Sequence, residues 1–248
     1  MGSPSSRYLD AAIGVLERIR DEEAGALADA GARVATAITD GRRVFAFGCS
    51  HSSLPVQDIV YRAGGLMLIN PLFAPGLTAL DVRPVTLTSE LERLSGLASA
   101  ILDHSALEPG DVLIVVSASG RNAVPVEIAE EASKRGCTVI AVTSRAYSDS
   151  VTSRHASGKK MHEFADVVLD NKVPIGDAAL EVEGVPQAIG PVSGVSSSAV
   201  LQGLVAEVIH QLVDRGVEPP VFLSGNLDGG LEYNARQLDQ YGDRIFYM

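Results

Sequence analysis

Two short runs of small polar residues, each directly after an apolar segment, are best placed to do chemistry. "GCSHSS" (48–53) follows the apolar run 42–48, and "SASGRN" (117–122) follows "DVLIV". Hydroxyls and free backbone N–H groups at the start of a helix bind phosphate and other anions. A single Ser-rich turn before a helix is more often an ordinary cap. The choice between an anion site and two caps depends on whether the fold brings the runs together.

Each run contains side chains that suit an anion. Four hydroxyls can donate hydrogen bonds to phosphate oxygens, those of Ser50, Ser52, Ser117 and Ser119. Gly120 lets the backbone approach a ligand closely. Asn122 can either cap the following helix or join the hydroxyls. The second run, with its S-x-S-G-x-N pattern, is the stronger signal.

The rest of the sequence alternates between apolar segments typical of strands and amphipathic segments typical of helices. Strands are predicted at 42–48, within 64–73 and at 165–170, while 111–120 is predicted as a strand, a turn and a helix start, a pattern that 138–144 repeats. Helices are predicted within 7–40 (one or two, broken near Gly31), at 88–107 and at 196–214. A Gly/Pro/Ser-rich stretch covers 174–198, and the tail 215–248 reads as an extension packed on the domain or on a neighbouring subunit.

Apolar strands separated by helices predict an α/β fold, a doubly wound five-stranded parallel sheet with helices on both faces. In such sheets a ligand binds beyond the carboxyl ends of the strands, where the strand order reverses. With the order 2-1-3-4-5, strands one and three are neighbours. The two polar runs then flank one crevice, which favours the anion site over two independent caps.

Charge limits the partners. The chain has 248 residues, of which 46% are apolar, and it carries 20 Lys and Arg against 31 Asp and Glu, a formal net charge of −11. Nucleic acids are bound by clustered positive charge, so we expect no nucleic-acid partner. An anionic small molecule remains compatible, because hydroxyl and backbone N–H groups can bind it locally.

Motifs for other chemistries are missing from the sequence. Cys49 and Cys137 have neither a zinc-site spacing nor a disulfide framework, and Cys137 is expected to pack behind a strand. The sequence contains no HExxH zinc motif, no Walker loop and no dinucleotide-binding G-x-G-x-x-G motif. We therefore expect no metal and no cofactor. Without a signal peptide or an apolar run of about 18 residues, we expect a cytoplasmic protein with no membrane contact.

The segment "VLIVVSASGRNAVPVEIAEEASKRGCTVIAVTS" closely resembles the core signature of the sugar isomerase (SIS) domain, which binds phosphosugars. The family pattern S-x-S-G-x-T, followed by a helix, a strand and Thr/Ser, is matched here with Asn122 where Thr is commoner. The resemblance covers about residues 5–215, which we take as the domain, with 216–248 as the extension. It implies a phosphosugar-binding set of Gly48, Ser50, Ser52, Ser53, Ser117, Ser119, Gly120, Asn122, Thr143, Ser144 and His155.

"FGCSHSS", "SGRN", "SRHASGK", "GDA" and "SGNLDGGLEYN" together resemble a phosphosugar-binding branch of SIS proteins without an assigned reaction, with some similarity to N-acetylmuramic acid 6-phosphate etherases. In the etherases a carboxylate on the helix before the S-x-S-G strand takes a proton from C2. The matching segment here, "TSELERLSG", offers Glu92 and, second, Glu90. Plain capping stays open for Glu92, since Ser89 to Glu92 fits a capping box.

An acid partner is also needed, and His51 is the best placed; otherwise it donates to phosphate. His155 belongs to a loop that closes over the sugar or reaches a neighbouring subunit, with Arg154, Lys159 and Lys160 beside it either steering an anion or forming a solvated charged loop. His210 is a weaker candidate, because the Gln-Glu pair that accompanies such a histidine in phosphosugar isomerases is missing. The tail offers Asn226, Asp228 and Glu232 as weaker candidates for sugar contacts, since an ordinary turn is the simpler explanation of "NLDGG".

These observations predict a homodimer or homotetramer that binds a sugar 6-phosphate. The acidic segment and the missing Gln-Glu pair favour a lyase or dehydratase acting on an N-acetylated amino-sugar 6-phosphate, such as N-acetylglucosamine 6-phosphate. An aldose–ketose isomerase and a non-catalytic phosphosugar sensor remain the alternatives.

Overall fold

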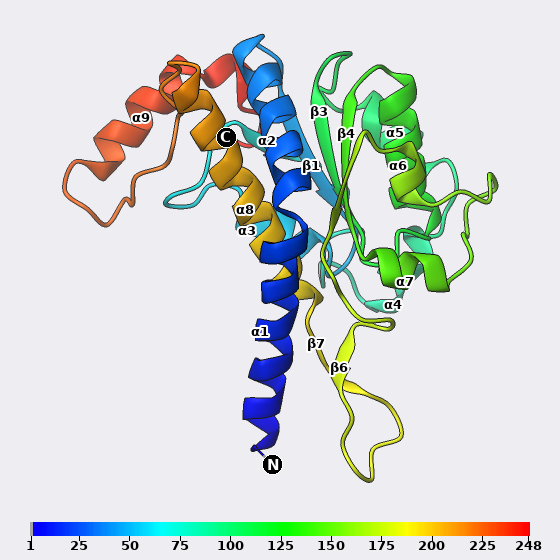
Figure 1. Cartoon of the computed structure of the whole chain (residues 1–248). Coiled ribbons are helices and arrows are strands. Elements are labelled where there is room, and N and C mark those ends of the chain that lie inside the picture. The colour runs from blue at the N-terminus through cyan, green and yellow to red at the C-terminus, as the bar shows by residue number, and fades with distance from the viewer. Residues whose placement is uncertain (1) are drawn as a thin grey trace.

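A five-stranded, all-parallel sheet forms the centre of the molecule, seen in a computed structural model that describes residues 2–248 (Figure 1). Its strands are β1 (Val44–Gly48), β2 (Ile69–Pro71), β3 (Val112–Val116), β4 (Thr138–Thr143) and β5 (Val167–Asp170). The order β2-β1-β3-β4-β5 confirms the predicted topology. Gly48 lies opposite Val116, and Val116 opposite Val142, so the loops that follow β1, β3 and β4 start at one edge of the sheet.

Helices cover both faces of the sheet because alternate strand residues point to opposite sides. Val44 and Ala46 pack under one layer, whereas Phe45 and Phe47 pack under the other. The first layer consists of α1 (Pro4–Glu22), α2 (Ala24–Thr39), α3 (Ser53–Asp58) and α8 (Ser193–Asp214). The second layer is built mainly from α5 (Leu97–Asp103), α6 (Ala123–Lys134) and η1 (Met161–Phe164). The helix α7 (Arg145–Ser150) follows β4 directly.

The predicted break near Gly31 was wrong. Helices α1 and α2 separate at Glu23, whereas Gly31 lies inside α2 and faces α8. The buried carboxylate of Glu23 accepts a hydrogen bond from the Asp170 backbone N–H (3.0 Å) and pairs with the Lys172 ammonium (2.6 Å). Glu23 thus ties the break to the end of β5, while Gly31 lets two helices approach closely.

The single helix predicted at 88–107 was also wrong. The segment forms two short helices, α4 (Thr86–Leu91) and α5, joined by a turn that ends at Gly96 with φ of 86°. A residue in the left-handed region interrupts a helix, and glycine adopts it without a steric cost. The turn carries Glu92, so the interruption decides where the candidate base lies.

The Gly/Pro/Ser-rich stretch forms an antiparallel hairpin that sequence reasoning missed. Its strands, β6 (Ala178–Leu180) and β7 (Ile189–Pro191), lead into α8, which begins earlier than predicted. The Tyr8 hydroxyl donates to the Pro191 carbonyl oxygen (2.9 Å), which joins the hairpin to α1. The amino-terminal half of α1 and this hairpin project together from the body (Figure 1).

The tail packs against this chain's own domain. It contains α9 (Gly230–Gln240) and η2 (Gly242–Arg244). The Met67 N–H donates to the Pro220 carbonyl oxygen (2.9 Å), and the Phe246 N–H to Oδ1 of Asn70 (2.7 Å). These bonds hold both ends of the tail near β2. Within residues 2–248, no helix combines the length and the apolar character required to cross a bilayer.

The packing of α2 on α8 makes a matched pair of glycine substitutions informative. A Cβ at Gly31 would lie 2.6 Å from the Cβ of Glu207, whereas a Cβ at Gly25, in the same helix, would meet nothing within 4 Å. We expect Gly31→Ala to lower the free energy of unfolding by about 1–3 kcal/mol through overpacking. Gly25→Ala should raise it by up to about 1 kcal/mol, because alanine favours the helix. Urea unfolding of both variants tests this, and equal effects would contradict the close packing.

Candidate functional site

The loop after β1 folds back tightly enough to require glycine as the last residue of the strand. A Cβ at Gly48 would lie 2.2 Å from the carbonyl oxygen of Ser52. Ser50 adopts a left-handed conformation with φ of 50°, which a serine rarely does. Its backbone N–H donates to the Leu77 carbonyl oxygen (2.6 Å). The segment that follows β2 therefore holds this turn in shape.

Three of the predicted hydroxyls are used in building the loops. The buried Ser53 hydroxyl donates to the Ser50 carbonyl oxygen (2.7 Å) and accepts from the Ala79 N–H (3.0 Å). The remaining two, also buried, belong to Thr143 and Ser144, which donate to the carbonyl oxygens of Ala118 (3.1 Å) and Val173 (2.6 Å) respectively. The structure gives these three hydroxyls a supporting role within the strand-end loops.

The loop after β3 leaves its hydroxyls available. Gly120 has φ of 56°, and its N–H donates to the Ser117 hydroxyl oxygen (3.2 Å), which leaves the Ser117 O–H free to donate elsewhere. Among residues 2–248, the hydroxyls of Ser52 and Ser119 have no hydrogen-bond partner, and Ser50 has only a long contact to Nδ1 of His51 (3.5 Å). The sheet register thus brings donors from both runs to one edge of the sheet.

Glu92 lies at the carboxyl-terminal end of α4, so the capping box predicted for Ser89 and Glu92 was wrong. Its backbone carbonyl oxygen accepts from the Val124 N–H in the first turn of α6 (3.1 Å). Its carboxylate accepts a short hydrogen bond from Nδ2 of Asn122, the residue that precedes α6. The turn after α4 is therefore docked on the start of α6. Glu90 is exposed and faces solvent.

The groups around Glu92 have opposing effects on the pKa of its carboxyl. Burial raises the pKa of its carboxyl above the ordinary value, while the Asn122 hydrogen bond and the charges of Arg93 and Arg154 act to lower it. Burial also raises the pKa of the Cys49 thiol, with a smaller contribution from the negative charge of Glu92. Glu92 is thus close to the loop after β1 as well as bonded to the loop after β3.

Arginines gather around this carboxylate. Nη1 of Arg154 donates to Oδ1 of Asn122 (2.7 Å), and the Arg154 backbone N–H donates to the Arg121 carbonyl oxygen (2.8 Å). Partial burial, Arg121 and Arg93 lower the pKa of Arg154, which reflects three like charges close together. Among residues 2–248, the buried Nε of Arg121 has no acceptor. A carboxylate, an amide and a guanidinium therefore form one hydrogen-bonded chain, Glu92–Asn122–Arg154.

The predicted histidines lie in different surroundings. His51 is exposed in the loop after β1, beside Ser50. Nε2 of His155 faces the carboxylates of Glu127 (3.7 Å) and Glu130 (3.9 Å) on α6, and its Nδ1 lies 2.8 Å from the Ser157 hydroxyl. His155 is thus packed on its own chain, along the side of α6.

The remaining candidates make no described contact with the strand-end loops. His210 is exposed on α8, where its Nε2 lies 3.4 Å from the Asp214 carboxylate. Lys160 donates to the Ser148 carbonyl oxygen, and Lys159 lies over the Phe164 ring. The tail residues Asn226, Asp228 and Glu232 are exposed. In the part of the chain that the structure describes, no group of three or more His, Cys, Asp or Glu side chains could hold a metal ion.

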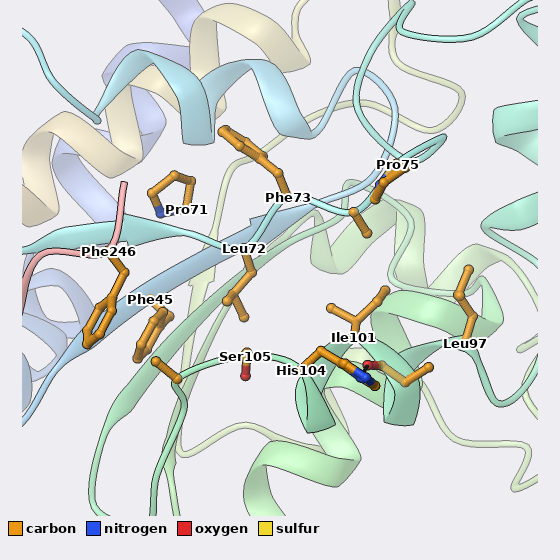
Figure 2. Close-up of a pocket in the computed structure, with 13 residues that line it drawn as sticks. Phe45, Pro71, Leu72, Phe73, Pro75, Leu97, Ile101, His104, Ser105 and Phe246 are labelled. Carbon is orange, nitrogen blue, oxygen red and sulfur yellow. Dashed lines mark hydrogen bonds between the residues drawn. The ribbon is translucent and has the colours of Figure 1, made fainter. Parts of the chain in front are cut away.

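A cavity of about 530 Å³ lies on the opposite side of β1 and β2 from α8 (Figure 2). Phe45 and Phe246 stack at one end of it, with ring centroids 6.0 Å apart, and α5 forms another wall. Its polar members His104 and Ser105 are hydrogen-bonded to the carbonyl oxygens of Ala100 (2.9 Å) and Leu102 (2.8 Å). The cavity shares no residue with the strand-end loops and lacks their unbonded hydroxyls, so the loops remain the candidate phosphate site.

Sequence reasoning missed two features of this site. The first is the pairing of Asn122 with Glu92 and Arg154, which are 30 and 32 positions away along the chain. The second is the arginine cluster, for which only adjacency was visible: Arg93 follows Glu92, and Arg121 precedes Asn122. Nothing in the spacing shows that Arg154 joins them.

Comparisons with known proteins agree with this architecture. The SIS domain family model matches residues 7–144. The UPF0309 protein SCO4393 of Streptomyces coelicolor is 53% identical over 244 residues, which cover 98% of this chain and 97% of that protein. The UPF0309 protein ABC0887 of Shouchella clausii is 41% identical over 242 residues, with 98% of each chain covered.

Solved structures of low sequence identity share the fold. A phosphoheptose isomerase, GmhA, from Neisseria gonorrhoeae has a TM-score of 0.54 and 18% identity, covering 84% of this chain and 96% of that one. The sugar isomerase domain of an RpiR transcription factor from Sphaerobacter thermophilus has a TM-score of 0.51 and 16% identity, covering 98% and 100%. With the family model matching more than half of its length, the chain belongs to the SIS domain family, and its relatives there are UPF0309 proteins.

Proposed function

We propose that this SIS phosphosugar-binding protein is a sugar-phosphate dehydratase that acts on an N-acetylated amino-sugar 6-phosphate, such as N-acetylglucosamine 6-phosphate. The observation that carries the proposal is the position of Glu92. Its half-buried carboxylate is bonded to the loop after β3 and lies close to the loop after β1. A base between two phosphate-binding loops would reach the carbons of a sugar whose phosphate those loops hold.

The phosphate group binds to hydroxyls in this proposal. Those that the protein itself leaves free to donate belong to Ser50, Ser52, Ser117 and Ser119. Ser53, Thr143 and Ser144 support the loops, and Gly48 and Gly120 allow their tight turns. Asn122 positions Glu92, because both ends of its amide are engaged by Glu92 and Arg154.

The reaction begins on the open-chain aldehyde, whose carbonyl makes the proton on C2 acidic. The Glu92 carboxylate takes that proton, and the electrons of the C–H bond form an enolate across C1 and C2. The enolate collapses to a C2–C3 double bond, the C3–O bond breaks, and His51 protonates the departing hydroxyl to give water. No oxidant or reductant is required. Holding C2 against the base can lower the barrier by several kcal/mol.

Phosphate binding is tested with two serines near opposite ends of α6. Ser119 precedes the helix and has a hydroxyl free to bind a ligand, whereas Ser133 is exposed near the other end of the helix. We expect Ser119→Ala to weaken both the sugar 6-phosphate and inorganic phosphate by about 1–2 kcal/mol, the scale of a hydrogen bond to a charged group. Ser133→Ala should leave both affinities unchanged. Titration calorimetry measures both affinities. If Ser119→Ala leaves them unchanged, the phosphate group does not bind at this loop.

The base is tested by a pair of isosteric variants in the same short segment. Glu92→Gln should abolish product formation while nearly preserving phosphosugar affinity, because only the proton acceptor is lost. Glu90→Gln should behave as the wild type, since Glu90 is exposed. The reaction is followed in heavy water by ultraviolet absorbance and proton NMR, where an olefinic signal with loss of the C3 oxygen identifies elimination.

Other outcomes of that experiment would redirect the assignment. A ketose product with deuterium at C1, where the proton taken from C2 is returned, would indicate an isomerase. Clear binding with no turnover of any sugar phosphate would indicate a sensor. Retained activity in Glu92→Gln together with loss in Glu90→Gln would show that the other carboxylate is the base.

We also propose that the protein self-associates through the projecting arm of α1 and the β6–β7 hairpin. Leu9 and Ile13 are exposed on this half of α1, Ile175 and Ile189 are exposed in or beside the hairpin, and the stretch 186–206 carries no charge. A second copy of the chain would cover these apolar side chains. Light scattering at micromolar concentration should give the molar mass of at least a dimer. Replacing Leu9 and Ile13 with Ser should lower that mass toward the monomer value. A monomeric wild type would contradict the proposal.

A further inference from the structure

Three arginines meet beside Glu92 without a matching set of carboxylates. Arg93, Arg121 and Arg154 interact electrostatically. Within residues 2–248, none of them has a carboxylate at ion-pair distance, whereas Arg135 lies 2.5 Å from Asp103 and Arg145 3.5 Å from Asp149. In a chain with net charge −11, acidic partners are abundant. Like charges brought together with no carboxylate at ion-pair distance create a positive potential that attracts an anion.

Hydrogen bonds connect this positive charge to the candidate base Glu92 rather than to the serine hydroxyls. Arg154 donates through Nη1 to Oδ1 of Asn122 (2.7 Å), and Nδ2 of the same amide donates to Glu92. The Asn122 amide thus lies between the Arg154 guanidinium and the Glu92 carboxylate and is hydrogen-bonded to both. Arg154 is exposed, so its other N–H groups are accessible to a ligand. Arg121 lies behind it, held by the Arg154 backbone N–H (2.8 Å) and by Thr152 (3.3 Å).

We propose that Arg154, supported by Arg93 and Arg121, binds the C1 oxygen of the substrate and stabilises the negative charge that develops there. This rests on the proposed function, which places Glu92 at C2, one bond from C1. When Glu92 takes the C2 proton, the C–H electrons move toward C1 and the carbonyl oxygen becomes an enolate oxygen. A fixed guanidinium next to that atom stabilises the enolate more than the neutral aldehyde and therefore lowers the barrier.

Kinetic tests use Arg154→Gln and Arg154→Lys, with Arg145→Gln as the matched control. Arg145 is exposed on α7 and paired with Asp149. Deuterium incorporation at C2 measures enolate formation separately from loss of water. We expect Arg154→Gln to lower both rates by about 10²–10³-fold at the pH plateau. Arg154→Lys should recover part of the loss, since it keeps the charge but not the forked geometry, and Arg145→Gln should match the wild type.

The pH profile supplies a second readout. Glu92 faces Asn122, Arg93, Arg154 and Cys49, and Arg154 is one of the charges that lower the pKa of its carboxyl. The base acts when deprotonated, so activity falls as the pH drops through that pKa. Removing Arg154 raises this pKa, and the acid limb of kcat/KM should therefore move to higher pH in Arg154→Gln but not in Arg145→Gln.

A binding test separates this inference from the proposed reaction. Two probes differ only at C1: 2-acetamido-2-deoxygluconate 6-phosphate carries a carboxylate there, and 2-acetamido-2-deoxyglucitol 6-phosphate carries an alcohol. The wild type should bind the carboxylate at least tenfold more tightly by calorimetry, and Arg154→Gln should lose that preference while keeping its affinity for the alcohol. This holds even if the wild type shows no turnover, an outcome that would overturn the dehydratase alone.

Two results would overturn the role of Arg154. One is an Arg154→Gln variant that keeps the carboxylate preference and reacts within twofold of the wild type at the pH plateau. The other is a variant that loses affinity for both probes and for inorganic phosphate equally, which would place the phosphate group, rather than C1, on Arg154.

Discussion

The candidate site depends on the docking of one turn onto the start of α6. The carbonyl oxygen of Glu92 accepts from Val124 (3.1 Å), and the Gly96 N–H donates to the Glu127 carboxylate (2.8 Å). Bonds at both ends of the turn fix its orientation, and the amide of Asn122 then fixes the Glu92 side chain. Because α6 begins directly after the loop of β3, the same docking sets the distance between the carboxylate and the serine hydroxyls.

Keeping a partly buried carboxylate at that position has an electrostatic cost. Burial disfavours its charged form and raises its pKa, which suits a base that must accept a proton near neutral pH. The Asn122 hydrogen bond and the nearby arginines limit that rise, so that the ionised form remains accessible. The dipole of α4 also acts on this carboxylate, because Glu92 lies at the carboxyl end of the helix. There the dipole disfavours a negative charge.

The parts of this architecture that follow from local patterns were predictable. Apolar strands ending in polar runs indicated a parallel sheet with a ligand site at the carboxyl ends of its strands, and the S-x-S-G pattern indicated the family. The helix interruption at Gly96 was not visible, because a capping box and an apolar periodicity both favoured one continuous helix. Gly31 was misinterpreted for a related reason. A glycine within a helical pattern suggests a helix break, and its real role, close packing against another helix, is visible only in the tertiary structure.

The arginine cluster shows why long-range electrostatics escapes sequence reasoning. Arg154 looked like part of a solvated loop, and only the tertiary contact with Asn122 joins it to Glu92. The resulting division of labour is consistent with a strongly acidic protein. Neutral hydroxyls at the strand ends can bind a phosphate without adding charge, and the local cations are concentrated where the proposed chemistry creates a new negative charge. A site that used those arginines for the phosphate would leave the enolate without a counter-charge beside the base.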